Sequence, residues 1–244
     1  MLTSKIRTPE EQRQYLDELK AWMDSEVNTP AEEMAAFFDK RIDGYEDVHL
    51  GHWPEEYAHI ADYFDDGLET LLDVGCGTGL ELEAIYRRFP AARVTGVDLS
   101  AEMLGKLREK YQAQAPELIQ ADYFQYPLGE NRYDAALSFE TLHHFSFEKK
   151  QDIYDKLYRA LKPGGYYVEC DYYACCEEEE QLCLAQYERK RREGNIPADV
   201  FVHLDIPLTL EHQMELLRRA GFRQIHVLYE NCGTVLLRAE KEEH

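Results

Sequence analysis

Three glycines alternate with other residues directly after an apolar run that ends at Asp73, at positions Gly75, Gly77 and Gly79. A helical pattern, ELEAIYRRF, follows them. Only a residue without a Cβ lets the backbone turn this sharply and lets a ligand approach it closely. The segment therefore predicts a strand, a tight turn and a helix that together meet a small, nucleotide-like molecule.

Two further acids follow apolar runs later in the chain. Asp98 ends the run VTGVD, and Asp122 follows another in QADYF. A carboxylate at the end of a second strand can accept two charge-assisted hydrogen bonds from ribose hydroxyls. Leu80 stands where a dinucleotide-binding G-x-G-x-x-G motif has its third glycine, which disfavours an NAD-type oxidoreductase but leaves it as an alternative.

Two adjacent histidines, His143 and His144, lie in the segment YDAALSFETLHHF, after a predicted fourth strand. Imidazole titrates near neutral pH, so each is a candidate for general base catalysis, and Glu140 is a third candidate. A histidine at such a place could equally cap or pack the loop.

Strands and helices alternate through the region that must position these groups. The periodicity predicts strands near 70–74, 93–98, 117–120, 134–139, 165–171, 222–230 and 233–239, and helices near 79–89, 101–112, 148–161, 175–193 and 209–220. This alternation predicts a parallel sheet with right-handed crossovers, and the final pair reads as an antiparallel hairpin. The carboxyl ends of parallel strands meet at one edge, so the acids above are expected around a single crevice.

Taken together, the glycine turn, Asp98, Asp122, the histidine segment and the turn LKPGGYYVE resemble the class I S-adenosylmethionine (SAM) dependent methyltransferases. The resemblance covers roughly residues 68–173, with a further match in AGFRQIHVLYENCGTVLLRAEK. It implies an α/β, Rossmann-like, seven-stranded, mostly parallel sheet whose last strand is antiparallel, with helices on both faces. A SAM-binding domain is then expected over 66–244.

The resemblance also implies which residues border the cofactor SAM. The expected cofactor-binding residues are Asp73, Gly75, Cys76, Gly77, Asp98, Leu99, Met103, Asp122, Tyr123 and Phe139. Among these, Asp98 is expected to bind the ribose hydroxyls and Asp122 the exocyclic amine of adenine. Phe139 and Glu140 are expected on the methionyl side. Leu99, Met103 and Tyr123 could equally be core residues.

Two segments are expected to add the acceptor-binding part: an N-terminal helical cap over 1–65 and a lid-like insertion over 174–208. Tyr45, Trp53 and His203 are the candidates for substrate contact, with packing of the helices as the alternative role. His49 and His52 are spaced as two metal ligands could be, but no further ligand lies nearby, so no metal site is expected.

Composition limits the partners. The chain of 244 residues carries a formal net charge of −21, which disfavours nucleic acid, since phosphates require cationic patches. The basic run RKRR at 189–192 follows four glutamates and reads as a solvated helix. No apolar run predicts a membrane span or a signal peptide, and the six cysteines show no zinc spacing. We therefore expect free thiols and a cytoplasmic protein.

The leading hypothesis is SAM-dependent methyl transfer to a small molecule by in-line displacement, with a base needed only if the acceptor must lose a proton. The alternatives are a non-catalytic SAM-binding or partner-binding protein, an NAD-type oxidoreductase and, lowest of the four, a protein methyltransferase. The sequence identifies neither the acceptor atom, the acceptor molecule nor the oligomeric state.

Overall fold

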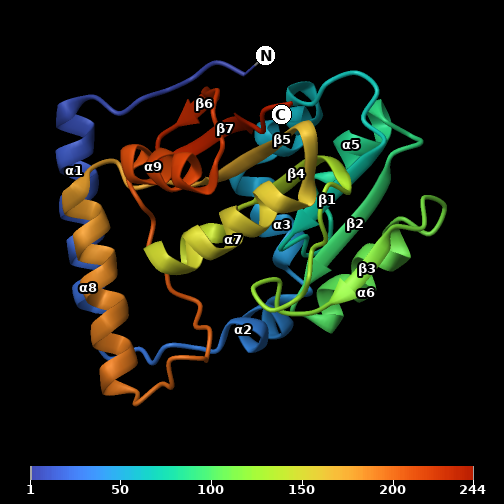
Figure 1. The fold of residues 1–244 in the computed structure, drawn as a ribbon. Helices are drawn as coiled ribbons and strands as arrows, with labels where there is room; N and C mark the ends of the chain where they lie inside the picture. The colour runs from blue at the N-terminus through green and yellow to red at the C-terminus, as the bar shows by residue number, and fades with distance from the viewer. Residues whose placement is uncertain (1, 244) are drawn as a thin grey trace.

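A seven-stranded sheet runs through the computed structural model, which describes residues 2–243 (Figure 1). The strand order is β3-β2-β1-β4-β5-β7-β6, and β7 is antiparallel to both of its neighbours whereas the other pairs are parallel. The strands are β1 (Thr70–Val74), β2 (Arg93–Asp98), β3 (Glu117–Gln120), β4 (Tyr133–Phe139), β5 (Leu161–Tyr172), β6 (Ile225–Asn231) and β7 (Thr234–Glu240). The predicted fold class is confirmed.

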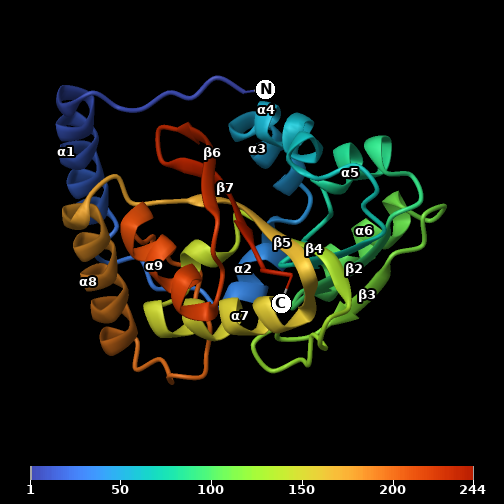
Figure 2. The same cartoon turned by 45° about the horizontal axis from the view of Figure 1, so that its top comes forward.

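Helices cover both faces of the sheet (Figure 2). One face packs against α4 (Pro54–His59), the 3₁₀ turn η1 (Ile60–Tyr63), α5 (Leu82–Arg88) and α6 (Ala101–Lys110); the other packs against α7 (Phe147–Ala160) and α9 (Leu210–Ala220). In α7 the residues Ile153, Tyr154, Leu157 and Ala160 are fully buried, and their spacing puts them on one face of the helix. Both sides of β1 and β4 are thereby removed from water, which suits their apolar sequences.

The N-terminal segment forms α1 (Pro9–Ser25), α2 (Met34–Arg41) and α3 (Tyr45–His52) before α4. α2 begins at Met34, because Glu33 before it forms a bridge with Val202 and its carboxylate accepts from the amides of Ala35 and Ala36. The aromatic segment GYEDVHLGHW is largely the helix α3.

α1 lies beside α8 (Glu177–Glu193) at one end of the molecule in both views, apart from α2–α4 (Figures 1 and 2). The Tyr15 hydroxyl donates to Glu179 at 2.5 Å, and Lys20 pairs with Glu178 at 2.6 Å. Lys190 and Arg191, from the basic run of α8, donate to backbone carbonyls of Glu26 and Val200 at 2.8 Å. The basic run therefore holds loops in place, and the N-terminal helices are divided between two parts of the fold.

We predict opposite effects of two glycine substitutions on stability. Gly221 ends α9 with φ 116°, and a Cβ there would lie 2.8 Å from the ring of Tyr158, so Gly221→Ala is expected to lower the free energy of unfolding by about 1–3 kcal/mol. Gly105 lies inside α6 with no atom within 4 Å of its Cβ position, so Gly105→Ala is expected to raise it by about 0.5–1 kcal/mol. Urea unfolding of both variants is the measurement, and equal effects would contradict this account.

Candidate active site

The glycine loop, residues 75–79, connects β1 to α5 at the carboxyl edge of the sheet. Its three glycines have φ values of 71°, 46° and 69°, in the left-handed region that side chains disfavour. A Cβ on Gly75 would lie 2.2 Å from Oγ1 of Thr141, which follows β4. The loop therefore needs glycine both for its turn and for its contact with the neighbouring strand end.

A cavity, here called the glycine-loop cavity, opens above this loop. Its walls come from α2, α3, the first turn of α6 and the segments at and after the ends of β1, β2, β3 and β4. The lining residues are Met34, Ala35, Phe38, Tyr45, Gly75, Gly77, Asp98, Leu99, Ser100, Met103, Tyr123, Glu140, Thr141 and Phe145. The candidates that it brings together are Tyr45, Gly75, Gly77, Asp98, Leu99, Met103, Tyr123 and Glu140. Met34, Phe38, Thr141 and Phe145 were not among the candidates, because apolar residues outside a motif carry no signal that separates a pocket from a core.

Asp98 presents its carboxylate to the cavity. One oxygen accepts from the amide of Gly77 at 2.9 Å and the other from the amide of Ser100 at 2.8 Å. Burial raises the pKa of Asp98, although these two hydrogen bonds oppose the shift. A carboxylate offers about four acceptor positions, so two remain for donors such as a pair of hydroxyls.

Asp73 lies beneath the same loop and is 1% exposed. Among residues 2–243, no hydrogen-bond donor reaches either of its oxygens, and Oε1 of the buried Glu81 is also without a donor. Burial, and then the neighbouring carboxyl of Glu81, raise the pKa of Asp73 well above its ordinary value. Asp73 and Glu81 are thus two buried acids side by side, and a positively charged ligand next to them would stabilise their ionised forms.

Four cofactor candidates do not line the glycine-loop cavity: Asp73, which lies beneath the loop, and Cys76, Asp122 and Phe139. The Cys76 side chain packs against β2, where its Sγ lies 2.8 Å from the Cβ position of Gly96. Phe139 stacks on Tyr57 with ring centroids 4.1 Å apart, and Asp122 accepts from the amide of Phe124 at 2.8 Å. The roles that the resemblance implies for Asp122 and Phe139, and for the backbone of Cys76, stay predictions.

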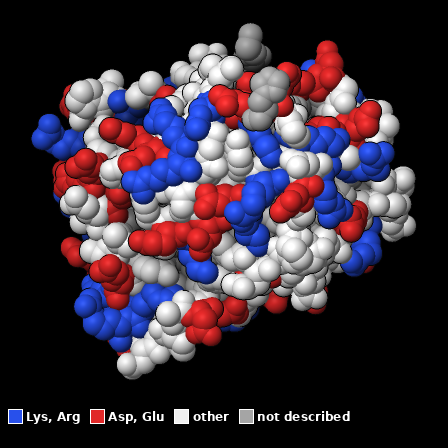
Figure 3. Space-filling model, in the orientation of Figure 1, with Lys and Arg blue, Asp and Glu red and all other residues white. Residues whose placement is uncertain are grey.

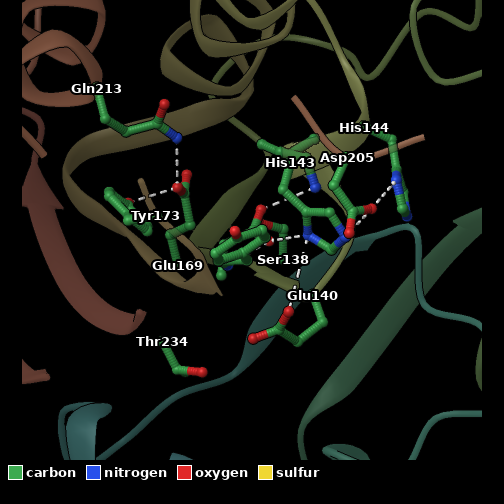
Figure 4. A network of polar contacts seen from close by, with 12 residues as sticks. Ser138, Glu140, His143, His144, Glu169, Tyr173, Asp205, Gln213 and Thr234 are labelled. Atoms are coloured by element: carbon green, nitrogen blue, oxygen red, sulfur yellow. Dashed lines mark hydrogen bonds and ion pairs between the residues drawn. The ribbon is translucent and has the colours of Figure 1, made fainter. Parts of the chain in front are cut away.

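His143 forms the central polar contact of the site. Its Nδ1 lies 2.5 Å from an oxygen of Asp171, at the carboxyl end of β5, and both residues are buried. Figure 4 shows the His143 ring between Glu140 and Asp205, whose nearest oxygens lie 3.7 Å from Nδ1 and 3.6 Å from Nε2. Burial alone would lower the pKa of His143, but Asp171, Asp205 and Glu140 outweigh it and raise the pKa to about 9. Asp171 thus orients the ring and directs Nε2 toward Asp205.

His144 pairs with the same aspartate, its Nδ1 lying 3.1 Å from Oδ1 of Asp205. Burial and the charge of His143 lower the pKa of His144, whereas the histidines hold the pKa of Asp205 below its ordinary value. The ligand atoms of His143, His144 and Asp205 lie within 4.8 Å of one another, so these groups could also hold a divalent cation, which the sequence did not suggest. Among the described residues, His49 and His52 do not belong to such a cluster. Nδ1 of His49 lies near the hydroxyl of Tyr57, and Nδ1 of His52 lies near the carbonyl of Val48.

A buried polar network supports β5 under the site. Glu169 is fully buried, and it accepts hydrogen bonds from the hydroxyls of Tyr154, Tyr167 and Tyr173 and from the amide of Gln213. Figure 4 shows Glu169 with Tyr173 and Gln213 on the opposite side of the network from Asp205. Because Glu169 precedes Asp171 by two residues, the network fixes the strand that carries Asp171.

The loop after α8 folds back onto the catalytic candidates. The amide of Ile206 donates to the carbonyl of His143 at 2.8 Å, and the amide of His203 donates to the carbonyl of Glu32 at 3.0 Å. The His203 ring stacks on Phe37 at 3.5 Å, and burial lowers its pKa to about 3. Trp53 lies elsewhere and donates to Thr234 at 2.9 Å.

Two residues of the site were missing from the sequence candidates. Asp171 could have been found, because it ends β5 at the same edge as the other acids. Asp205 lies in an irregular loop and carries no signal in the sequence.

Residues 71–165 match the family described as a methyltransferase domain. The chain is 30% identical over 126 residues to the malonyl-[acyl-carrier protein] O-methyltransferase of Priestia megaterium, which covers 52% of this chain and 45% of that one. It is 28% identical to an O-methyltransferase of Penicillium expansum over 76% of this chain and 68% of that one. These matches support a class I SAM-dependent methyltransferase domain in this part of the chain.

The fold of this chain also resembles solved structures. Human N-acetylserotonin methyltransferase in complex with SAM gives a TM-score of 0.60 at 20% identity, over 81% of this chain and 55% of that one. Streptomyces venezuelae DesVI gives a TM-score of 0.61 at 21% identity, and the match covers 82% of this chain and 98% of DesVI. At about 20% identity, these similarities to solved structures concern the fold alone. Among the sequence relatives, the chain covers less than half of the Priestia protein.

We predict that Asp171 controls the titration of His143. With a pKa of about 9 against an ordinary 6.5, the charged pair stabilises the fold fully below pH 6.5, and this contribution is lost as the pH rises through about 9. Asp171→Asn removes the largest opposing charge, so burial should bring the pKa of His143 down toward or below 6.5. NMR titration of labelled histidines measures the pKa of His143 in the wild type and the variant. The control is His226→Gln, on the exposed face of β6. An unchanged pKa would show that Asp171 does not hold the ring's proton.

Proposed function

We propose that this methyltransferase binds SAM in the glycine-loop cavity and transfers its methyl group to a small molecule, with His143 as the general base. The observation that carries the proposal is the buried His143–Asp171 pair, adjacent through Glu140 to the glycine-loop cavity. Relatives described as O-methyltransferases support the same activity.

The residues around the cavity fit SAM. Asp73, whose buried oxygens have no donor, suits a cationic part of the ligand, and Asp98 has free acceptor positions for ribose hydroxyls. Leu99 and Met103 offer apolar contact for the adenine ring. When bound, SAM supplies a methyl group on a positively charged sulfur, which is already activated for displacement.

The protein's own contribution is then to align the acceptor, exclude water and remove a proton. Asp171 keeps the proton of His143 on Nδ1, so that Nε2 can receive a proton from the acceptor once the ring is neutral. His144 is a weaker base, because burial and the charge of His143 lower its pKa, and Oε1 of Glu140 has no hydrogen-bond partner among residues 2–243 that would orient it.

The surface supports a small acceptor rather than nucleic acid. On the face in Figure 3, Lys and Arg are interspersed with Asp and Glu, apart from a denser basic group at the lower left, where α8 ends. Within the part of the chain that the structure describes, no helix has the length and apolarity to cross a bilayer. The six cysteines are unpaired, which supports our proposal of a reducing, cytoplasmic location.

Asp98→Asn tests the cofactor site. We expect calorimetry to show binding of S-adenosylhomocysteine by the wild type and a loss of about 1–3 kcal/mol in the variant, because hydroxyl donors lose a charged partner. Glu102→Gln, on the exposed side of α6, is the matched control. Absence of binding by the wild type would remove the proposed function, and an unaltered affinity in Asp98→Asn would remove the ribose assignment.

The rate of methyl transfer should depend on the ionisation of His143. Because the base must be neutral and its pKa is about 9, kcat is expected to rise with pH up to about 9 and then level off. His143→Gln should lower kcat about 10²–10⁴-fold and abolish this rise, while His226→Gln changes neither. The measurement is production of S-adenosylhomocysteine against pH with any acceptor that is turned over. Cofactor binding without transfer to any of a broad acceptor panel would instead favour a non-catalytic SAM-binding protein.

A further inference from the structure

Two imidazoles and one carboxylate converge beside the catalytic candidates. Oδ1 of Asp205 lies 3.6 Å from Nε2 of His143 and 3.1 Å from Nδ1 of His144, and the three atoms lie within 4.8 Å of one another. Figure 4 shows the Asp205 carboxylate between the two rings. Ligand atoms of a tetrahedral zinc site, with bonds of about 2.0–2.1 Å, are about 3.3–3.4 Å apart, a spacing between the two distances from Asp205. An ion among these atoms therefore needs only small movements of the side chains.

A buried aspartate orients His143 from behind. Asp171 accepts the Nδ1–H of His143 at 2.5 Å, so the lone pair on Nε2 is directed toward Asp205. The amides of Leu142 and Tyr172 donate to the same Asp171 carboxylate at 2.8 and 2.9 Å. Histidines that bind metals usually donate their other ring N–H to a carboxylate in this way, because the contact fixes the tautomer and makes the ring a better ligand.

The backbone already joins the two segments that carry these side chains. His143 and His144 belong to the 3₁₀ turn η2 (Leu142–His144), and Asp205 lies in the loop after α8. The amide of Ile206, next to Asp205, donates to the carbonyl of His143 at 2.8 Å. Because the segments are held together without an ion, little additional ordering of the chain opposes ion binding.

Asp205 also gives an ion a path to the three ligand atoms. Its side chain is 46% exposed and lines a cavity of about 370 Å³ that is enclosed by α1, α8 and the loop after α8, which we call the roof cavity. Two imidazoles with one carboxylate favour Zn²⁺ and other divalent transition metals, whereas Mg²⁺ and Ca²⁺ prefer oxygen ligands. Three protein ligands leave a fourth position of a tetrahedral ion for water.

We propose that His143, His144 and Asp205 bind one divalent transition metal ion, such as Zn²⁺, through Nε2, Nδ1 and a carboxylate oxygen. The ion occupies the same lone pair of His143 that receives a proton in the proposed function, and this consequence rests on that function. The metal-free protein is therefore the form that transfers the methyl group, and a bound ion inhibits the transfer.

Calorimetry with Zn²⁺ tests the site. We expect the wild type to bind Zn²⁺ with a Kd in the micromolar range or below, and an excess of Mg²⁺ to leave this binding unchanged. Asp205→Asn, at a half-exposed side chain, should weaken it at least about 100-fold by removing a charged ligand. Asp171→Asn keeps all three ligands and should weaken it about 10–100-fold. Asp199→Asn, at an exposed position of the same loop, is the matched control and should bind as the wild type does.

NMR spectra of ¹⁵N-labelled histidines locate the ion, because the free cysteines can also bind Zn²⁺. Zn²⁺ should move the Nε2 signal of His143 and the Nδ1 signal of His144, and leave the exposed His226 unchanged. The metal site is overturned if the signals of His143 and His144 stay in place, or if Asp205→Asn binds Zn²⁺ as tightly as Asp199→Asn.

Kinetics test the inhibition with any acceptor that is turned over. Filling the site with Zn²⁺ should lower kcat about 10²–10⁴-fold, as His143→Gln does, and EDTA should restore it. If His143→Gln lowers kcat but Zn²⁺ in the filled site does not, the inhibition is overturned. If neither lowers it, the base assignment in the proposed function has failed. Failure of S-adenosylhomocysteine to bind would overturn the proposed function as a whole, whereas the metal site is decided by the calorimetry and the NMR spectra.

Discussion

Carboxyl groups buried at one edge of the sheet constrain everything built around them. A desolvated carboxylate is costly unless donors or a cation compensate it. Asp98 has two backbone amides, Asp171 has His143, and Glu169 has three tyrosine hydroxyls and an amide. Among residues 2–243, no donor reaches either oxygen of Asp73 or Oε1 of the neighbouring Glu81, which makes this part of the site complementary to a cationic ligand.

The arrangement of the fold follows from that edge. Parallel strands bring the acids together, and the polar network around Glu169 lies in the interior, where it holds β5 and so the Asp171 carboxylate. The loop after α8 is tied to the carbonyl of His143 through Ile206, so the roof and the catalytic candidates share a backbone contact.

Local patterns made much of this predictable from the sequence. The glycine loop, Asp98 and His143 each follow a strand with a clear apolar run, and their positions depend mainly on neighbours in the chain. Asp171 obeys the same rule and could have been included.

Residues outside the motifs could not be predicted in this way. Asp205 reaches the site through its contacts with His143 and His144, which are distant in the sequence, and it lies in no recognisable motif. The start of α2 depends on the same kind of contact, since the bridge between Glu33 and Val202 joins segments far apart in the chain.

The pairing of α1 with α8 sets an order on the assembly of the molecule. A helix of 17 residues is marginal on its own in water, and the partners that bury α1, among them Tyr172 and Glu179, come much later in the chain. During synthesis, α1 therefore emerges before α8 and must wait for it before the two can pack. Most of the residues of the glycine-loop edge lie between α1 and α8 in the chain, so the contact between these helices forms after that part of the edge has been synthesised.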